Sequence, residues 1–493
     1  MATPRSRRRW ALVVGAAAIA AVVAARRSRR AQHDPPAATP IRARTRNRRR
    51  LELARVGGRA GADFALHRAR RTFANAERQA ELDRRFELRT AEQVAETLGN
   101  MKGAFMKLGQ MASYLDTGLP DHVRQTLQSL QQEAPPMAPE LAAGVVEQEL
   151  GAAPDAVFLE WDPVPIAAAS IGQVHRAITR DGRAVAVKVQ YPGVDEAIRS
   201  DLEAAGPVYS ALGLALPGFD PAPVLAEIRA RVVEELDYAN EARNQQLFAD
   251  FYRGHPFVHV PDVLTELSTP RVLTTELAEG ARFDEVVGWD QDERNLAGEA
   301  IYRFVFRSLY RLQAFNGDPH PGNYLFRPGG RVTFLDFGLV KHFTPADIDV
   351  FGEMLRAMVN DRDIGRYRRI VERIGMLRPG APLTDEQVYG YFSHFYEFVL
   401  EDAEVTITPD WSRQVVARFF DAAGEHGPVL KAANLPPNFV IIQRINLGLM
   451  AVLGDLRATA NFRGIANELW PWVDGPPSSE MGKAEADWLA GRQ

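Results

Sequence analysis

Two short polar motifs, separated by a strand-like segment, constrain the fold of this chain more than any other feature. The first motif is Asp318-Pro-His-Pro-Gly-Asn323, and the second is Asp336-Phe-Gly338. The apolar residues Val332 to Leu335 between them predict a β-strand. A loop Asp and Asn followed by an Asp at a strand end bring three oxygen ligands together, which suits Mg²⁺. Either motif alone is typical of a turn, but both around one strand favour phosphoryl transfer.

In a phosphoryl-transfer site the three polar residues have separate roles. Asp318 would orient an attacking hydroxyl group or accept its proton, as a catalytic residue. Asn323 and Asp336 would hold the metal ion that neutralises charge on the phosphates. The predicted cofactors are therefore ATP and Mg²⁺.

A matching phosphate-binding segment lies upstream. Residues Ala167 to Val174 fit the kinase loop pattern G-x-G-x-x-G-x-V if Ala167 and Ala169 replace the first two glycines. The sequence Val-Ala-Val-Lys then ends at Lys188, the residue type that contacts the α- and β-phosphates of ATP. The alanine segment alone is typical of a small-residue turn, but with this lysine it predicts nucleotide binding. Besides Lys188, the predicted nucleotide-binding residues of this segment are Ala167, Ala168, Ala169, Ser170, Gly172 and Val174.

A kinase-type lysine needs a carboxylate on a helix to hold it. Glu234, Asp237 and Glu241 follow one another at spacings of three and four residues, which places them on adjacent faces of a helix. Further on, Arg271 to Gly280 predicts a strand and a connection between two lobes. From its position in the chain, this connection would offer backbone hydrogen bonds to adenine from Glu276, Leu277 and Ala278.

The pattern along the chain predicts an α+β, bilobal architecture. A length of 493 residues is too long for one compact core, and ligands commonly bind between two lobes. The expected units are a basic arm at 1–50, a helical N-terminal extension at 51–150, a lobe with a small mixed sheet at 151–280, a larger helical lobe at 281–475 and a polar tail at 476–493.

The first fifty residues differ from the rest. They hold fourteen of the 59 basic residues and one of the 63 acidic residues, so the remaining chain is strongly acidic. That acidic balance argues against nucleic-acid binding by the main domains. Cysteine is absent, which excludes disulfides and thiolate chemistry and is compatible with a reducing compartment.

An apolar run at residues 10–25, flanked by arginines, is slightly short for a membrane-spanning helix, which needs about 17–25 residues. We expect it to anchor the protein at a membrane. The basic residues that follow it disfavour a cleaved signal, and a basic arm without membrane contact is the other reading. The second apolar stretch, Phe439 to Leu456, contains Arg444 and Asp455 and predicts a packed helix rather than a membrane span.

Together with Lys107-Leu-Gly-Gln110, these residues resemble the UbiB/AarF-domain (ADCK) family of atypical kinases. Lys107 and Gln110 fit the K-x-G-Q motif of that family, the alanine-rich loop is a second family mark, and Glu235 and Asp237 fit its E-x-D motif. In the family a helix glutamate lies six residues after the first acid of E-x-D, which selects Glu241 as the partner of Lys188. The resemblance runs from about residue 90 to 465.

The resemblance implies a bilobal protein-kinase-like fold whose N-terminal helices lie across the active site. Lys107 is then expected to reach Glu235 and Asp237, to occupy the cleft where a peptide would bind and to take part in catalysis. Lys107, Gln110, Glu235 and Asp237 are the predicted occluding residues.

The family also implies ATPase or unorthodox kinase activity in isoprenoid quinone or lipid metabolism. Quinone or lipid intermediates and a membrane surface are therefore the expected partners. The protein is expected at the cytoplasmic face of a membrane if residues 10–25 anchor the chain, and in the cytoplasm otherwise. Two alternatives remain. One is a small-molecule phosphotransferase of the aminoglycoside-kinase type, whose catalytic signature residues 316–323 and 335–338 also resemble. The other is a nucleotide-binding scaffold with negligible turnover.

Overall fold

The computed structural model describes residues 138–169, 171–195, 236–317, 319–420, 424–434 and 437–492. These residues form two compact units. The smaller unit contains the described residues up to Ala239 together with Leu264–Thr274, and the larger unit contains Asn240–Val263 and the residues from Thr275 onward. This division differs from the expected boundary near residue 280. The basic arm, the apolar run at 10–25 and the K-x-G-Q motif lie outside the described residues.

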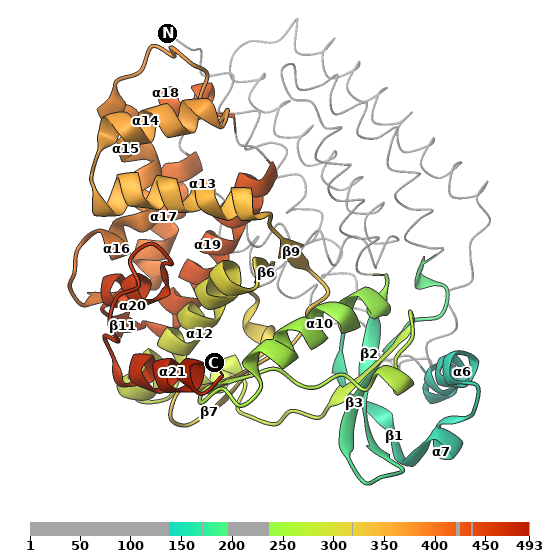
Figure 1. The fold of residues 1–493 in the computed structure, drawn as a ribbon. Helices are drawn as coiled ribbons and strands as arrows, with labels where there is room; N and C mark the ends of the chain where they lie inside the picture. Colours follow the sequence, from blue (N-terminus) through green and yellow to red (C-terminus); the bar gives the residue numbers. More distant parts are fainter. Residues whose placement is uncertain are drawn as a thin grey trace, which may run out of the picture. The chain divides into compact units, whose positions relative to one another are not determined.

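The smaller unit is built on an antiparallel sheet (Figure 1). Its strands are β1 (Phe158–Ala168), β2 (Gly172–Thr179), β3 (Ala184–Gln190) and β5 (Val272–Glu276), in the order β1-β2-β3-β5. Helices α6 (Pro139–Leu150) and α7 (Pro154–Val157) precede the sheet. The alternation of β3 buries Val185, Val187 and Val189 against α6, so that Lys188 faces the opposite side of the strand. The Asp181-Gly182 turn, in which Gly182 has a φ of 88°, precedes this strand.

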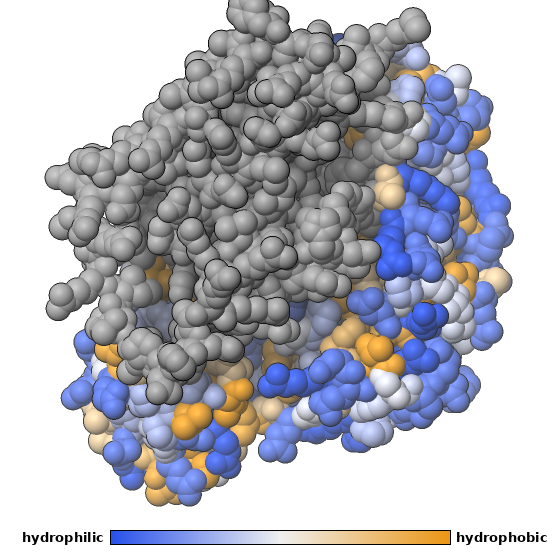
Figure 2. Space-filling view, turned by 180° about the vertical axis from the view of Figure 1, so that it is seen from behind, coloured by the Kyte–Doolittle hydropathy of each residue, from blue (hydrophilic) through white to orange (hydrophobic). Residues whose placement is uncertain are grey.

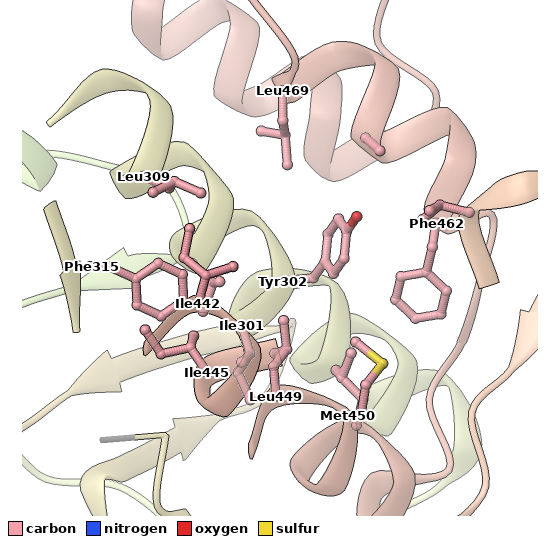
Figure 3. Close-up of a cluster of buried hydrophobic side chains, with 14 of the residues drawn as sticks. Ile301, Tyr302, Leu309, Phe315, Ile442, Ile445, Leu449, Met450, Phe462 and Leu469 are labelled. Carbon is pink, nitrogen blue, oxygen red and sulfur yellow. The ribbon is translucent and has the colours of Figure 1, made fainter. Parts of the chain in front are cut away.

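The larger unit is mainly helical, as expected for the second lobe. Its long central helix is α12 (Gln291–Arg311), which the Asp290 side chain caps by accepting a hydrogen bond from the Glu293 backbone. Figure 3 shows side chains from α12, α19 (Pro437–Leu456) and α20 (Phe462–Leu469) pointing toward one another in the buried core. The other helices with at least six residues are α10 (Tyr238–Tyr252), whose first two residues belong to the smaller unit, α13 (Pro345–Leu355), α14 (Ile364–Arg373), α15 (Asp385–Ser393), α17 (Pro409–Phe420), α18 (Gly427–Ala432) and α21 (Glu480–Ala490).

Short strands position the polar motifs of the larger unit. Strands β7 (Tyr324–Arg327) and β8 (Arg331–Phe334) form an antiparallel hairpin, and β4 (Val258–His259) pairs with β8 in parallel. Strand β6 (Ala314–Asn316) pairs with β9 (Val340–His342). Strand β8 confirms the strand expected between the two motifs. The pairing of β6 with β9 joins the segments on either side of the two motifs.

Two stretches near the C-terminal end of the chain form the helices α19 and α21. Helix α19 is a packed helix, as expected, and its residues Ile445, Leu449 and Leu453 are fully buried. None of the helices in the described part of the chain combines the length and apolar character that a membrane crossing requires. The predicted polar tail instead contains α21, which buries Met481 and Glu485. Glu485 is buried because two arginines of α12 hold its carboxylate, a pairing that local polarity does not reveal.

The surface view in Figure 2 shows mostly hydrophilic residues on the visible face of the larger unit. Apolar residues occur there in small scattered groups, which is normal for a folded domain. In the described part of the smaller unit, the exposed large apolar side chains Leu159, Val164 and Ile166 all lie on β1.

Candidate active site

Three of the predicted nucleotide-binding residues form one row across the sheet of the smaller unit. Ala167 on β1 is the cross-strand partner of Val174 on β2, and Val174 is the cross-strand partner of Lys188 on β3. Directly opposite residues of antiparallel strands share one face of the sheet. Since the neighbours of Lys188 in β3, Val187 and Val189, face the buried core, this row lies on the other face. Ala167 and Lys188, which are 21 positions apart in the chain, are thus placed in one row, as the kinase pattern requires.

The alanine segment forms the tight connection between β1 and β2. The backbone N–H of Ala169 donates to the carbonyl of Gly172 at 2.9 Å, which closes the turn, and Ala168 is the last residue of β1. Gly172 has no room for a side chain, because a Cβ atom there would lie 2.3 Å from the carbonyl oxygen of Val189. Ser170 lies outside the described residues.

Tyr238 is a residue of the site that the sequence did not single out. The ammonium nitrogen of Lys188 lies 5.0 Å from the centre of the Tyr238 ring, a distance at which the ring face attracts the cation. Tyr238 is fully buried, and its hydroxyl group lies 2.8 Å from the position that a Cβ would take on Gly172. The ring therefore lies near both Gly172 and Lys188. The sequence feature that points to Tyr238 is its position directly after the E-x-D motif.

The acids of the E-x-D motif precede α10 (Tyr238–Tyr252). The carboxylate of Asp237 accepts a hydrogen bond of 3.0 Å from the backbone N–H of Ala239 and so caps the start of this helix. Glu235, Lys107 and Gln110 lie outside the described residues, and the contact of Lys107 with the acids stays a prediction.

The predicted metal ligands lie on one hairpin of the larger unit. The backbone N–H of Leu335 donates to the carbonyl of Asn323 at 2.8 Å. Asn323 directly precedes β7 and Asp336 is the second residue after β8, so both lie at the same end of the β7–β8 hairpin. Asn323 ends a short 3₁₀ turn (Pro321–Asn323) that the His320 side chain caps. Asp318 lies outside the described residues. A carboxylate and a carboxamide oxygen in this place are a donor set that Mg²⁺ accepts.

Asp336 has an unusual backbone conformation. Its φ of 59° lies in the left-handed region, which costs a non-glycine residue about 1 kcal/mol or more. The turn is held by two hydrogen bonds: the Gly338 N–H donates to the Asp336 carboxylate at 3.1 Å, and the Asn316 side chain donates to the Asp336 carbonyl at 3.0 Å. The surrounding structure thus fixes the orientation of this carboxylate.

Helix α10 lies against the same turn. Glu241 is buried, and its carboxylate oxygen lies 3.5 Å from where a Cβ would stand on Gly338. The side-chain amide of Asn244 donates to the carbonyl of Phe337 at 3.2 Å, and its oxygen pairs with His342 at 3.2 Å. The ring of Phe337 packs on Phe248, with ring centres 4.9 Å apart. Asn244 was missed by the sequence analysis, and the predicted ion pair of Glu241 with Lys188 joins residues of the two units and stays a prediction.

The expected adenine-binding connection begins at the end of β5. The N–H of Glu276 already donates to the carbonyl of Asp262 at 2.9 Å, and its own carbonyl accepts a hydrogen bond of 3.3 Å from the Thr275 hydroxyl group. A hydrogen bond from His259 lowers the pKa of the Glu276 carboxyl group below its ordinary value. Ala278 lies in the irregular segment that follows β5. The adenine contacts of both residues stay predictions.

Comparisons with known proteins agree with this arrangement. The family model of the ABC1 atypical kinase-like domain matches residues 129–370. The rat protein "Atypical kinase COQ8B, mitochondrial" is 36% identical over 277 residues, which cover 55% of this chain and 52% of the relative. The Arabidopsis thaliana protein "ACTIVITY OF BC1 COMPLEX KINASE 8, chloroplastic" is 32% identical over 306 residues, or 60% of this chain and 40% of the relative. The chain thus spans about half or less of these relatives.

A solved structure covers more of the chain. The structure of Rv3197 of Mycobacterium tuberculosis, in complex with erythromycin, has a TM-score of 0.60 and 30% sequence identity. The match covers 81% of this chain and 100% of that chain. The expected α+β, protein-kinase-like fold is confirmed. With the alanine turn, the lysine strand and the Asp-Phe-Gly turn in the order that the resemblance requires, the chain belongs to the UbiB family of atypical kinases, which carry the ABC1 domain.

Proposed function

We propose that the protein binds Mg²⁺-ATP and transfers or hydrolyses its γ-phosphoryl group. The observation that carries this proposal is the β7–β8 hairpin, which places Asn323 beside the strained and hydrogen-bonded Asp336. A carboxylate that two hydrogen bonds hold in the left-handed backbone region, next to a second oxygen ligand, supports a functional role. The row of Ala167, Val174 and Lys188 gives independent support, because it reproduces the phosphate-binding strands of kinases.

Each residue has a distinct task in this proposal. Bound Mg²⁺-ATP supplies the transferable phosphoryl group and a charge that stabilises the phosphates during transfer. Lys188 contacts the phosphates as a point charge, and Glu241 holds Lys188 in place. Asn323 and Asp336 are the metal ligands. Asp318 orients the attacking hydroxyl group or water and accepts its proton.

The cellular role that we propose follows from the family. The activity would serve isoprenoid quinone or lipid metabolism at a membrane, with residues 10–25 as the anchor and Lys107 restricting access of peptides to the cleft. Quinone and lipid profiles of a deletion strain test this role, when the strain is complemented with either the wild type or Asp336→Asn. Profiles restored equally by both genes would contradict a role for phosphoryl transfer in that metabolism.

The biochemical test uses the purified full chain with Mg²⁺ and ATP, with and without lipid vesicles or a quinone-like phenol. We expect hydrolysis that Asp336→Asn abolishes, because the amide removes the negative charge that holds the metal. Asp349→Asn is the matched control, since Asp349 is an exposed carboxylate on α13 outside the site. Unchanged turnover in Asp336→Asn would contradict the assignment of the metal ligand.

The same assay separates the two alternatives. A small-molecule phosphotransferase would give a labelled organic product, and erythromycin is a suitable acceptor to include because Rv3197 was solved in complex with it. A scaffold would bind Mg²⁺-ATP without turnover under every condition. Lipid- or phenol-stimulated release of inorganic phosphate, without labelled erythromycin, supports the UbiB-type activity.

A further inference from the structure

The C-terminal helix α21 and the residues after it contact the C-terminal end of α10. The indole N–H of Trp488 donates to the carbonyl of Arg253 at 3.3 Å. The Trp488 ring lies parallel to Tyr252, with ring centres 6.3 Å apart, and meets His255 edge-on at 4.4 Å. Figure 1 shows the C terminus beside this end of α10. The ring of Trp488 on α21 thus packs against two rings at the end of α10, those of Tyr252 and His255.

Arg492 completes this contact by capping α10. Its guanidinium group donates to the carbonyls of Phe251 and, at 3.2 Å, Asp250. The last carbonyls of a helix have no partner within the helix and carry the negative end of its dipole, so a cation there is stabilising. The same guanidinium lies 4.8 Å from the centre of the Trp488 ring. Arg492, which lies 241 positions after Phe251, therefore adds to the local end of α10, where Gly254 has a φ of 73° and the His255 N–H donates to the Tyr252 carbonyl at 2.9 Å.

Helix α21 is itself fixed to the centre of the larger unit. Glu485 is almost completely buried and accepts hydrogen bonds of 2.9 Å from both Arg303 and Arg307 of α12. Arg303 also donates to Glu468 of α20 at 2.8 Å. Breaking a buried, fully paired charge network of this kind is costly, because it leaves an uncompensated charge. Helix α21 is therefore a firm support for α10.

The other end of α10 faces the Asp-Phe-Gly turn. Helix α10 has fifteen residues and is thus about 22 Å long. Between its two ends, Asn244 bonds the carbonyl of Phe337 and Phe248 packs on the Phe337 ring. Because an α-helix moves as a rigid element, a shift at Asp250 also displaces Glu241 and Asn244. The position of α21 is thereby coupled to the turn that carries Asp336.

We propose that α21 is a positioning element for α10, in which Trp488 and Arg492 keep Glu241 and Asn244 in register with the Asp336 turn. This proposal rests on the proposed function, since it concerns the geometry of that site. Trp488 and Arg492 are positioning residues and do not touch substrate. Their contribution is to kcat, through the placement of α10, more than to the binding of nucleotide.

The test compares four variants of the full chain. Arg492→Ala removes the cap, Arg492→Lys keeps a cation, and Trp488→Phe keeps the ring while losing its N–H donor. Lys483→Ala is the matched control, because Lys483 is an exposed cation on the same helix that pairs only with Glu480 in the described structure. The measurements are kcat and KM for ATP hydrolysis, the melting temperature, and hydrogen exchange of residues 240–252.

We expect Arg492→Ala to raise exchange in residues 240–252 and to lower kcat roughly three- to tenfold, with a smaller change in KM, as the loss of one helix-end charge interaction implies. In Arg492→Lys, the kcat and the exchange of residues 240–252 should both be close to the wild-type values, and Lys483→Ala should match the wild type. Wild-type kcat and wild-type exchange in Arg492→Ala and Trp488→Phe would overturn the proposal. An equal loss of kcat in Arg492→Lys and Arg492→Ala would also overturn it, since the retained charge should matter.

The exchange measurement separates this inference from the proposed function. If the wild type shows no turnover, the proposed function fails, whereas the exchange data still report whether α21 restrains α10. If the wild type is active and Arg492→Ala alters neither exchange nor kcat, the proposed function stands and the positioning role fails. If Arg492→Ala lowers the melting temperature of the whole protein, the kcat and exchange of Trp488→Phe decide whether α21 positions α10, because this smaller change retains an aromatic ring at position 488.

Discussion

The side chain of Asn244 donates a hydrogen bond to the backbone carbonyl of Phe337 and so ties α10 to the middle of the Asp-Phe-Gly turn. Asn244 is buried, and its oxygen pairs with His342 of β9. One amide group therefore connects the helix that carries Glu241 with both sides of the turn that carries Asp336. Such a connection explains how this helix and the predicted metal ligand keep a fixed geometry.

Replacing Asn244 tests this connection. Asn244→Ala leaves the Phe337 carbonyl and the His342 ring without their partner, and it should lower the free energy of unfolding by about 1–3 kcal/mol. It should also lower Mg²⁺-dependent ATP turnover, because the turn loses its contact with α10. Gln246→Ala is the control, since the Gln246 amide bonds only Asp250 on the same helix. Equal turnover in the two variants would show that the amide link has no functional role.

Tyr238 gives a second prediction, on nucleotide affinity. Its ring lies under the ammonium group of Lys188, and a partly buried cation–π contact contributes about 0.5–2 kcal/mol. Tyr238→Leu should therefore weaken ATP binding by about two- to thirtyfold. Tyr238→Phe keeps the ring and should bind ATP as the wild type does. Titration with a fluorescent ATP analogue measures both, and equally weakened binding in both variants would assign the effect to the hydroxyl group instead.

Much of the local structure around the candidate site was predictable because each of its motifs is short. The strand from Val332 to Phe334, the turn at Asp336 and the Lys188 strand each carry their signal within a few residues, as alternation, turn chemistry or motif spacing. The family resemblance, which rests on the order of these motifs, implied the kinase-like fold, and the comparisons confirm it.

The contacts missed by sequence analysis join residues far apart in the chain. Asn244 and Phe337 are 93 positions apart, and Glu485 lies 178 positions from Arg307. A polar residue on a helix predicts exposure unless a distant partner satisfies it, and periodicity carries no information about that partner. For this reason the sequence predicts a polar tail at 476–493, although the helix in this segment is anchored in the core.

Gly448 of α19 provides a test of the loop that contains the predicted catalytic Asp318. A Cβ on Gly448 would lie 2.4 Å from the Cγ of Pro319, so the helix approaches this loop closely only because residue 448 is glycine. Gly448→Ala should cost about 1–3 kcal/mol of stability by overpacking and should strongly reduce ATP turnover, since the loop must shift. Gly144→Ala on α6 is the control. A Cβ there meets no atom within 4 Å, so that variant should be slightly more stable and retain turnover. Normal turnover in a folded Gly448→Ala protein would contradict the coupling of α19 to the loop.

His394 makes the stability of the larger unit depend on pH. It is 2% exposed and lies among aromatic rings, with Phe395 at 4.3 Å and the parallel ring of His426 at 5.9 Å between centres. Burial lowers the pKa of His394 to about 4, and the nearby charges of His426 and Arg418 act in the same direction. In the unfolded chain the pKa of the group is about 6.5. The fold therefore favours the neutral ring.

A folded-state pKa below the unfolded one means that the contribution of His394 is fully present above pH 6.5. It is lost as the pH falls from about 6.5 to about 4, because the unfolded chain then binds a proton that the folded protein rejects. A shift of this size corresponds to about 3 kcal/mol. Burial also lowers the pKa of His255, so the wild type should lose further stability as the pH falls. Urea unfolding measures this effect. The free energy of unfolding of the wild type should fall steeply between pH 7.5 and pH 4.5. In His394→Phe, which keeps an aromatic ring without a titrating group, the fall over the same pH range should be smaller by about 3 kcal/mol. Parallel curves for the two proteins would mean that His394 keeps an ordinary pKa in the folded state.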